Sequence, residues 1–249
     1  MNNNQKHQFA FHMDGLARQL EHLTVGTSFS ITDKQLVHRV ISILRLAPGQ
    51  TFIVFDKQIH AHVQLITSSK NKEVTIILED VQKNKIIKPT IIFLLPLLKK
   101  EAFENALYSL VEVGVTQIQL VTTEKSQHRW QPKDQQRSEK IIIAAAEQSK
   151  NFAYPELLPV LTLSNAIHQA PNNKKVFFDP AGITFSTCVK ELQNQQNITL
   201  ALGPEGDLTK QEKEMMHEAG FIFCALTPTI LRSCQAAALG AGIIRSLIR

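Results

Sequence analysis

The sequence has few of the residues that mark several large classes of protein. Its three cysteines, Cys188, Cys224 and Cys234, are odd in number and lack metal-ligand spacing, which argues against a disulfide framework and a zinc site. No apolar run approaches the roughly 18–20 residues of a membrane-spanning helix, and the start has no signal-peptide hydrophobic region. We therefore expect a cytoplasmic protein without a bound metal and without a membrane partner.

The composition is that of a globular protein. The chain has 249 residues, of which 43% are hydrophobic, and this is enough to fill the core of one large or two smaller domains. Its formal net charge of +5 is compatible with a polyanionic partner, although many enzymes without one are equally basic.

The first third of the chain has the pattern of a small β-barrel. Short apolar runs are broken by turn signals, at 28–31, 51–55, 62–66 and 74–78. One helix is expected from Leu36 to Leu44, before a Pro48-Gly49 turn. The pattern changes after the polar Lys83-Asn84-Lys85, so we expect one domain over residues 1–80 and a second over 88–249.

The second domain alternates strands and helices, which predicts an α/β fold with a mainly parallel sheet covered by helices on both faces. The expected strands cover 90–95, 115–122, 159–161, 176–179, 198–202 and 221–226. The expected helices cover about 102–111, 138–149, 164–169 and 209–219, with a last one after Arg232.

The most informative stretch runs from Ile198 to Arg232. A strand stops at Gly203-Pro204-Glu205-Gly206, a capping box follows at 209–212, and a second strand ends before another loop at 227–232. If the two strands are parallel, both loops lie at their carboxyl ends, where open α/β sheets bind ligands. Alone, the glycine motif is equally compatible with an ordinary tight turn.

Several motifs are shared with a known group of enzymes. The GPEG loop is followed, after roughly twenty-five residues, by a hydrophobic strand, Ile230-Leu231-Arg232 and an alanine-rich helix. Three further segments resemble that group's ELGV, EAAEQS and H…LRLKPGD motifs: 112–115, 144–149, and His38 with 44–49. The sequence thus resembles, over almost its whole length, the SPOUT methyltransferases, and among them the ribosomal RNA small subunit methyltransferase E family.

This resemblance implies a function and a set of site residues. The family methylates N3 of a uridine in 16S ribosomal RNA of the small subunit with S-adenosylmethionine, and it combines a PUA-like domain with a knotted SPOUT domain as a homodimer. The residues expected to bind the cofactor are Leu202, Gly203, Pro204, Glu205, Gly206, Leu226, Ile230 and Leu231. The residues expected to contact RNA are His38, Arg45, Arg129, Trp130 and Arg137.

Arg232 is the catalytic candidate. Uridine N3 must lose a proton, and an arginine at a helix N-terminus would stabilise the charge that develops on the uracil. A phosphate contact or a salt bridge to Glu205 is the alternative. Cys234 raises the further alternative of carbon methylation, which we disfavour because Ser233 is expected to cap the helix and to leave Cys234 as a small first-turn residue.

The loop from Lys125 to Lys133 is basic and contains the only tryptophan. We interpret it as RNA-facing, and the resemblance aligns Arg137 with an arginine of the family. The alternative is a solvated loop whose Trp130 packs on the sheet.

The chain also departs from the family pattern. Asp207 replaces a usual glycine, and Thr227, Thr229, Cys234 and Gln235 differ from LGPRILRTETA. These departures motivate one alternative, a SPOUT-fold RNA-binding protein with lost or altered catalysis. A further alternative keeps catalysis but moves it to another RNA position or to a ribose 2′-OH.

Overall fold

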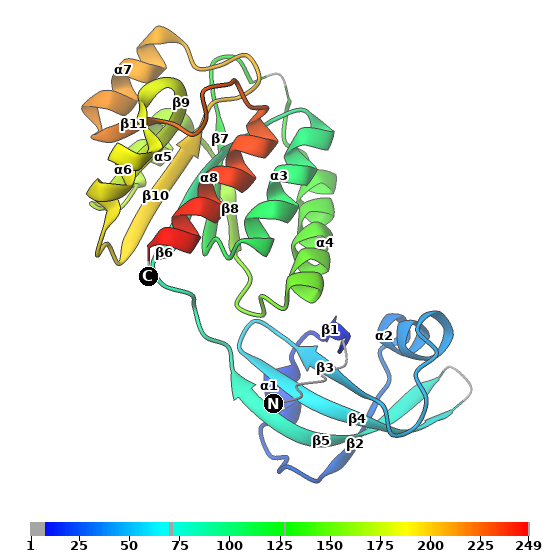
Figure 1. Cartoon of the computed structure of the whole chain (residues 1–249). Coiled ribbons are helices and arrows are strands. Elements are labelled where there is room, and N and C mark those ends of the chain that lie inside the picture. Colours follow the sequence, from blue (N-terminus) through cyan, green and yellow to red (C-terminus); the bar gives the residue numbers. More distant parts are fainter. Residues whose placement is uncertain (1–7, 70–71, 127, 249) are drawn as a thin grey trace. The chain divides into compact units, whose positions relative to one another are not determined.

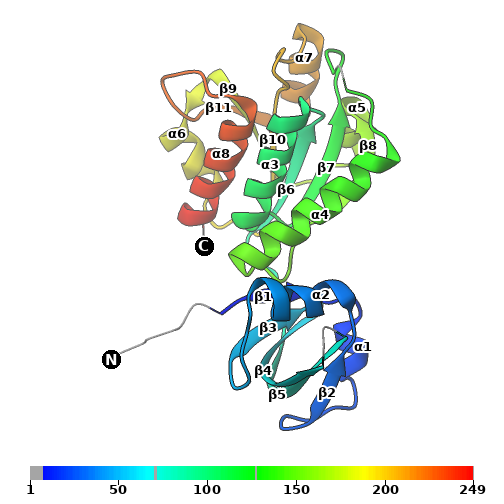
Figure 2. The same ribbon diagram turned by 90° about the vertical axis from the view of Figure 1, so that its right-hand side faces the viewer.

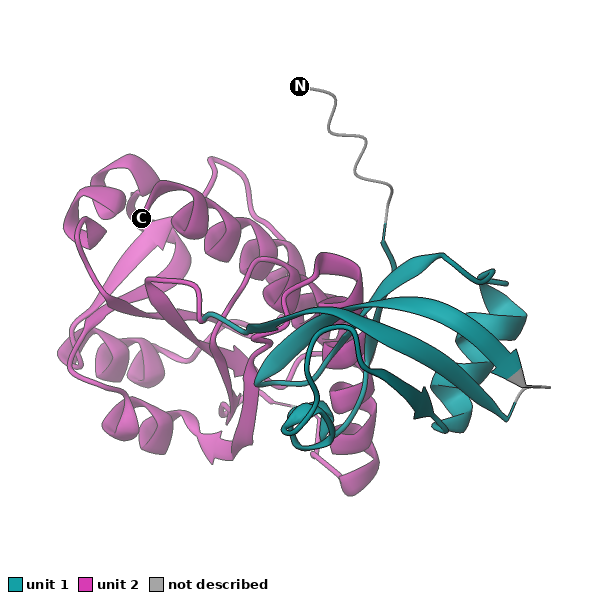
Figure 3. Cartoon of the chain, turned by 90° about the horizontal axis from the view of Figure 1, so that it is seen from below, with its two compact units in different colours: residues 1–85 teal, residues 86–249 magenta. Residues whose placement is uncertain are grey.

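The computed structural model describes residues 8–69, 72–126 and 128–248. The chain divides into two compact units, residues 1–85 and 86–249 (Figure 3).

The first unit contains one mixed five-stranded sheet. Its strands are β1 (Ala10–His12), β2 (Ser28–Ile31), β3 (Thr51–Phe55), β4 (Ile59–Ser69) and β5 (Glu73–Lys83). They pair in the order β1-β3-β4-β5-β2, with β1 and β3 parallel and the other pairs antiparallel. No pairing among the described strands closes this ladder into a barrel, so the closed barrel stays a prediction.

Short helices cover the apolar side of this sheet. They are α1 (Leu16–Leu20), α2 (Lys34–His38) and the π-helical turn η1 (Arg39–Ile43). The helix expected over 36–44 is therefore present as α2 and η1 together, whereas α1 was not expected. Leu16, Val37 and Val40 are fully buried with alternate residues of β4 and β5, which explains why these strands show period-two apolar patterns.

The second unit is an α/β structure around a six-stranded sheet (Figure 1). The strands are β6 (Thr90–Pro96), β7 (Gln117–Thr122), β8 (Glu156–Thr162), β9 (Lys174–Thr184), β10 (Asn197–Leu202) and β11 (Phe221–Ala225). Their order is β11-β9-β10-β6-β7-β8, and each neighbouring pair is parallel. The predicted parallel sheet is confirmed. All the loops that follow its strands therefore lie at one edge.

Helices cover both faces of this sheet, as predicted. They are α3 (Lys100–Glu112), α4 (Pro132–Ser149), α5 (Leu163–Gln169), α6 (Phe185–Leu192), α7 (Lys210–Glu218) and α8 (Ser233–Leu247). α3 packs between α4 and α8 on one face, and α5 and α7 pack together on the other (Figures 1 and 2). No helix in the described part of the chain is both long and apolar enough to cross a membrane.

Two of these helices differ from the sequence-based expectation. α4 begins at Pro132 instead of Ser138, because proline fits the first helical turn and Gln131 and Asp134 form a capping box there. α6 was not expected at all. Its apolar residues Phe185, Cys188, Val189 and Leu192 follow the i, i+3, i+4, i+7 spacing of an amphipathic helix, so the sequence does contain a signal for it.

The small residues of α8 pack against their own unit. Ala237, Gly240 and Ala241 are buried, and a Cβ on Gly240 would lie 2.4 Å from the ring of Phe178 on β9. Arg245 fixes the other end of the helix, since its guanidinium donates to the carbonyls of Pro89 and Gly114 at 2.6 Å each. The close approach that these small residues allow is therefore made within the chain.

Candidate functional site

Most of the predicted cofactor residues surround one cavity of about 780 Å³, which we call the first cavity. It lies where the loop after β10 meets the loop after β11. The predicted site residues in its wall are Leu202, Gly203, Pro204, Glu205, Leu226, Ile230, Leu231 and Arg232. Gly206 lines a neighbouring cavity instead. The volume is in the range of small-molecule sites.

The β10–α7 loop turns tightly beneath this cavity. The Asp207 amide donates to the Pro204 carbonyl at 2.9 Å, and Asp207 has a left-handed φ of 57°. Glycine adopts this conformation without strain, and aspartate is among the few other residues that tolerate it. The replacement of the family's glycine by Asp207 is therefore compatible with the same turn.

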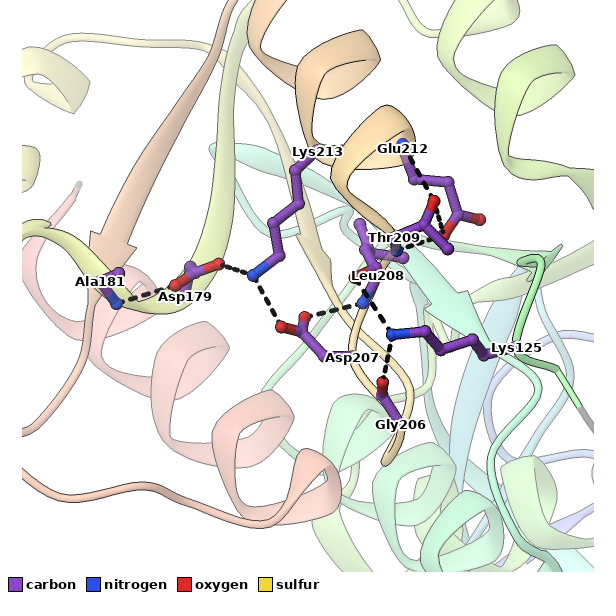
Figure 4. Close-up of polar contacts among 9 residues, drawn as sticks. All are labelled: Lys125, Asp179, Ala181, Gly206, Asp207, Leu208, Thr209, Glu212 and Lys213. Carbon is purple, nitrogen blue, oxygen red and sulfur yellow. Dashed lines mark hydrogen bonds and ion pairs between the residues drawn. The ribbon is translucent and has the colours of Figure 1, made fainter.

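A lysine that the sequence did not single out neutralises Asp207 (Figure 4). The Lys213 Nζ on α7 lies 2.7 Å from Oδ2 of Asp207 and 2.7 Å from Oδ2 of Asp179 in the middle of β9. Burial acts to lower the pKa of Lys213, but the two carboxylates outweigh it and raise that pKa. Asp179 is buried, and its Oδ1 also accepts the Ala181 amide at 2.8 Å.

The β7–α4 loop is tied to the same region. The Lys125 Nζ donates to the Gly206 carbonyl at 2.8 Å (Figure 4). Glu212 accepts the Thr209 amide at 2.8 Å in the predicted capping box, and it also accepts the Glu124 amide at 2.9 Å. These contacts fix the glycine loop between α7 and the loop after β7.

The second loop reaches the first through Ser233. Its hydroxyl donates to the Gly203 carbonyl at 3.2 Å, and α8 has no side-chain cap at its N-terminus. The prediction that Ser233 caps α8 is therefore wrong, because its hydroxyl bonds the neighbouring loop. Cys234 is half-buried in the cavity wall.

Arg232 is exposed in the wall of the first cavity, directly before α8. Within the described parts of the chain its guanidinium has no hydrogen bond and no ion pair. The alternative salt bridge to Glu205 is not formed, since Oε1 of Glu205 accepts the Lys99 amide at 3.0 Å. Arg232 is thus free to meet a ligand.

The RNA candidates in and after the basic loop have different surroundings in the structure. Trp130 is half-buried and packs edge-to-face on Phe103 of α3, with ring centroids 5.5 Å apart, so it packs on a helix and not on the sheet. Arg137 makes a bidentate pair with Glu104, at 3.2 and 3.0 Å. The hydrogen bond with Arg137 lowers the pKa of Glu104. Of the three RNA candidates Arg129, Trp130 and Arg137, only Arg129 is exposed without a side-chain partner among the described residues.

The two RNA candidates of the first unit are both exposed. His38 ends α2, and Arg45 lies in the following turn with a φ of 51°. Both therefore lie on the surface of the first unit.

The sequence and the fold are similar to those of known proteins. A family model described as an RNA methyltransferase domain matches residues 85–245. The ribosomal RNA small subunit methyltransferase E of Bacillus subtilis (strain 168) is 24% identical to the chain, in an alignment that covers 83% of this chain and 85% of the relative. The enzyme of the same name from Buchnera aphidicola subsp. Schizaphis graminum is 27% identical, and that alignment covers 80% of this chain and 83% of the relative.

A solved structure of similar fold is that of a ribosomal RNA small subunit methyltransferase E from Neisseria gonorrhoeae bound to S-adenosyl methionine. It has a TM-score of 0.82 and 25% identity, and the superposition covers 97% of this chain and 98% of that one. The family model spans well over half of the sequence and includes every loop that builds the first cavity. The chain belongs to the RNA methyltransferase family.

Proposed function

We propose that this protein is an S-adenosylmethionine-dependent methyltransferase of 16S ribosomal RNA in the small ribosomal subunit, and that its acceptor atom is N3 of a uridine. The observation that carries the proposal is the first cavity, which gathers the GPEG loop and the Ile230-Leu231-Arg232 loop at the carboxyl ends of parallel strands. Family membership and the relatives' names support the reaction class.

The residues of the first cavity fit this cofactor. Loop backbone at Leu202, Gly203, Leu226 and Ile230 offers N–H and C=O groups for the adenine, ribose and methionine parts. The loop leaves little room for a side chain at Gly203, because a Cβ there would lie 3.2 Å from Oδ1 of Asp207. When bound, S-adenosylmethionine supplies an already activated methyl group, so the chain's task is to position it.

Arg232 is the residue we assign to the acceptor base. Its exposed guanidinium and the N-terminal dipole of α8 are placed to stabilise negative charge on the uracil carbonyls as the N3 proton leaves. The alternative role is that of a phosphate clamp. Because paired bases hide N3, the target must be unpaired or flipped out of its helix.

The departures from the family pattern are compatible with cofactor binding. A lone carboxylate at Asp207 would repel the cofactor carboxylate in a dry site, but Lys213 pairs with it at 2.7 Å. Thr227 is likewise satisfied, since its hydroxyl donates to the Thr229 carbonyl at 2.7 Å. These contacts favour an active enzyme over an RNA-binding protein that has lost catalysis.

The remaining parts of the proposal concern assembly. We assign the first unit as a PUA-like RNA platform, with His38 and Arg45 among its RNA contacts, and the second as a knotted SPOUT domain. We further propose a homodimer acting in the cytoplasm, where small ribosomal subunits are made. A mixed β-sheet with exposed basic groups supports the platform role.

Calorimetric titration with S-adenosylmethionine tests the proposal. The wild-type protein is expected to bind, and Gly203→Val is expected to weaken binding at least tenfold, or about 1.4 kcal/mol, because its side chain would press on Asp207 and distort the loop that lines the cavity. Circular dichroism shows whether the variant is folded. A folded wild-type protein that does not bind S-adenosylmethionine would refute the proposal.

A further inference from the structure

A second cavity, of about 790 Å³, adjoins the first. Three loops build it, and they follow the neighbouring strands β7, β6 and β10. Lys99, Pro204 and Glu205 line both cavities. A molecule in the second cavity would therefore be separated from a molecule in the first cavity only by these shared residues at the carboxyl end of the sheet.

The two cavities differ in charge. Four carboxylates line the first, from Glu101, Asp179, Glu205 and Asp207, against the cations of Lys99 and Arg232. Lys213 adds one cation from behind that wall. The second cavity reverses the balance, with three ammonium groups, from Lys99, Lys100 and Lys125, against Glu124 and Glu205. Its surplus of positive charge favours an anionic ligand.

The lysines of the second cavity divide into two kinds. The Nζ of Lys125 is held by the carbonyls of Gly206 and Leu208, at 2.8 and 3.5 Å, so it braces two of the three loops (Figure 4). Lys99 and Lys100 are exposed, and their ammonium groups donate no hydrogen bond to any described residue. The N–H donors of both ammonium groups are therefore available to a ligand.

We propose that the second cavity receives the methyl-acceptor nucleotide of the RNA, with Lys99 and Lys100 on its phosphates and its base directed across the shared wall toward the first cavity. This inference rests on the proposed function. A lysine is a compact point charge that suits phosphate oxygens, and a flipped nucleotide needs a pocket of its own beside the cofactor. Lys125 acts as a positioning residue because it holds the loops that shape the pocket. A net-positive cofactor such as S-adenosylmethionine suits the more acidic first cavity instead.

The test compares Lys100→Gln and Lys99→Gln with the matched control Lys190→Gln. Lys190 is an exposed lysine on α6 that lines neither cavity. The full-length proteins are titrated with unmethylated small ribosomal subunits at several salt concentrations, and with uridine 5′-monophosphate and uridine by ligand-observed NMR.

Each cavity variant is expected to bind the subunit about tenfold more weakly, with a log–log salt slope shallower by roughly 0.7–0.9 for the one lost phosphate contact. These variants should no longer bind uridine 5′-monophosphate more tightly than uridine. The affinity of Lys100→Gln for S-adenosylmethionine should stay unchanged. Lys190→Gln should match the wild type in every measurement.

The inference would be overturned if both cavity variants bound the subunit with the same affinity and salt slope as the wild-type protein. It would also be overturned if the wild-type protein bound uridine 5′-monophosphate no more tightly than uridine. Failure of the proposed function gives a different result, namely a wild-type protein without S-adenosylmethionine binding. The two failures are therefore distinguishable.

Discussion

Lys213 on α7 forms an ion pair with Asp207 in the loop that precedes this helix, with Nζ 2.7 Å from Oδ2. The same ammonium group contacts the buried Asp179 in the middle of β9. One cation thus fixes the glycine loop to the next strand of the sheet. This pairing explains how the chain carries an aspartate where its family usually has glycine.

Lys213→Met is expected to destabilise the protein. The substitution removes the partner of Asp179, whose carboxylate stays buried, and the cost should be about 1–3 kcal/mol. Lys210→Met on the same helix is the matched control, because its ammonium is exposed and lies 3.8 Å from Glu214, and we expect a change below about 0.5 kcal/mol. Urea unfolding of both variants measures the difference.

This contribution should also depend on pH. The folded-state pKa of Lys213 is raised above the ordinary value of 10.5, so its stabilising effect is fully present below that value and is lost as the pH rises through the higher folded pKa. Unfolding curves of wild type and Lys213→Met should converge only at such alkaline pH. Equal stability of the two proteins at neutral pH would contradict the role given to Lys213.

Arg232→Ala tests the mechanism. If Arg232 stabilises charge on the uracil, turnover should fall by something like a hundredfold while S-adenosylmethionine affinity barely changes. Steady-state kinetics on small-subunit particles and calorimetry give the two values. Full turnover with weaker RNA binding would instead make Arg232 a phosphate clamp.

Arg129 and Arg137 should now behave differently. Arg129→Ala is expected to weaken RNA binding at every sequence and to reduce the salt slope by roughly one unit. Arg137→Ala should have less effect, because its guanidinium is occupied by Glu104. That pair persists in acid, since the pKa of Glu104 is lowered and the contribution disappears only as the pH falls through it. Filter binding over a salt series compares the two variants.

The proposed homodimer is tested at the exposed residues of α8 and not at its small residues. Ala237 and Gly240 are buried in their own unit, so changing them perturbs folding. Leu239 and Leu247 are the exposed apolar residues of α8, at 38% and 51%. Leu239→Glu should shift sedimentation toward the monomer with little loss of stability, because a charge would be buried at the interface. A monomeric wild type at micromolar concentration would rule out the dimer.

The features that the sequence predicted well depend on local chemistry. The strand before Gly203, the capping box at Thr209 and the stop at Gly220 are specified by neighbouring residues, and the structure has all three. The parallel sheet follows from the alternation of strands and helices. The position of the first cavity could be predicted because the loops 203–208 and 227–232 both follow strands of this parallel sheet.

The features that the sequence could not predict depend on which elements become neighbours. Lys213 meets Asp179 only because β9 lies beside β10, and Glu104 captures Arg137 only because α3 packs on α4. The second cavity likewise requires the order β7-β6-β10. Neither the hydrophobic periodicity nor the spacing of the motifs predicts the order of the strands in the sheet or the packing of the helices.

The most direct test of the central proposal is mass spectrometry of 16S ribosomal RNA from cells with and without this gene. We predict that one uridine carries an N3-methyl group only when the gene is present, and that the wild-type gene restores it while the Arg232→Ala gene restores little. Identical methylation of the RNA from both strains would contradict the account.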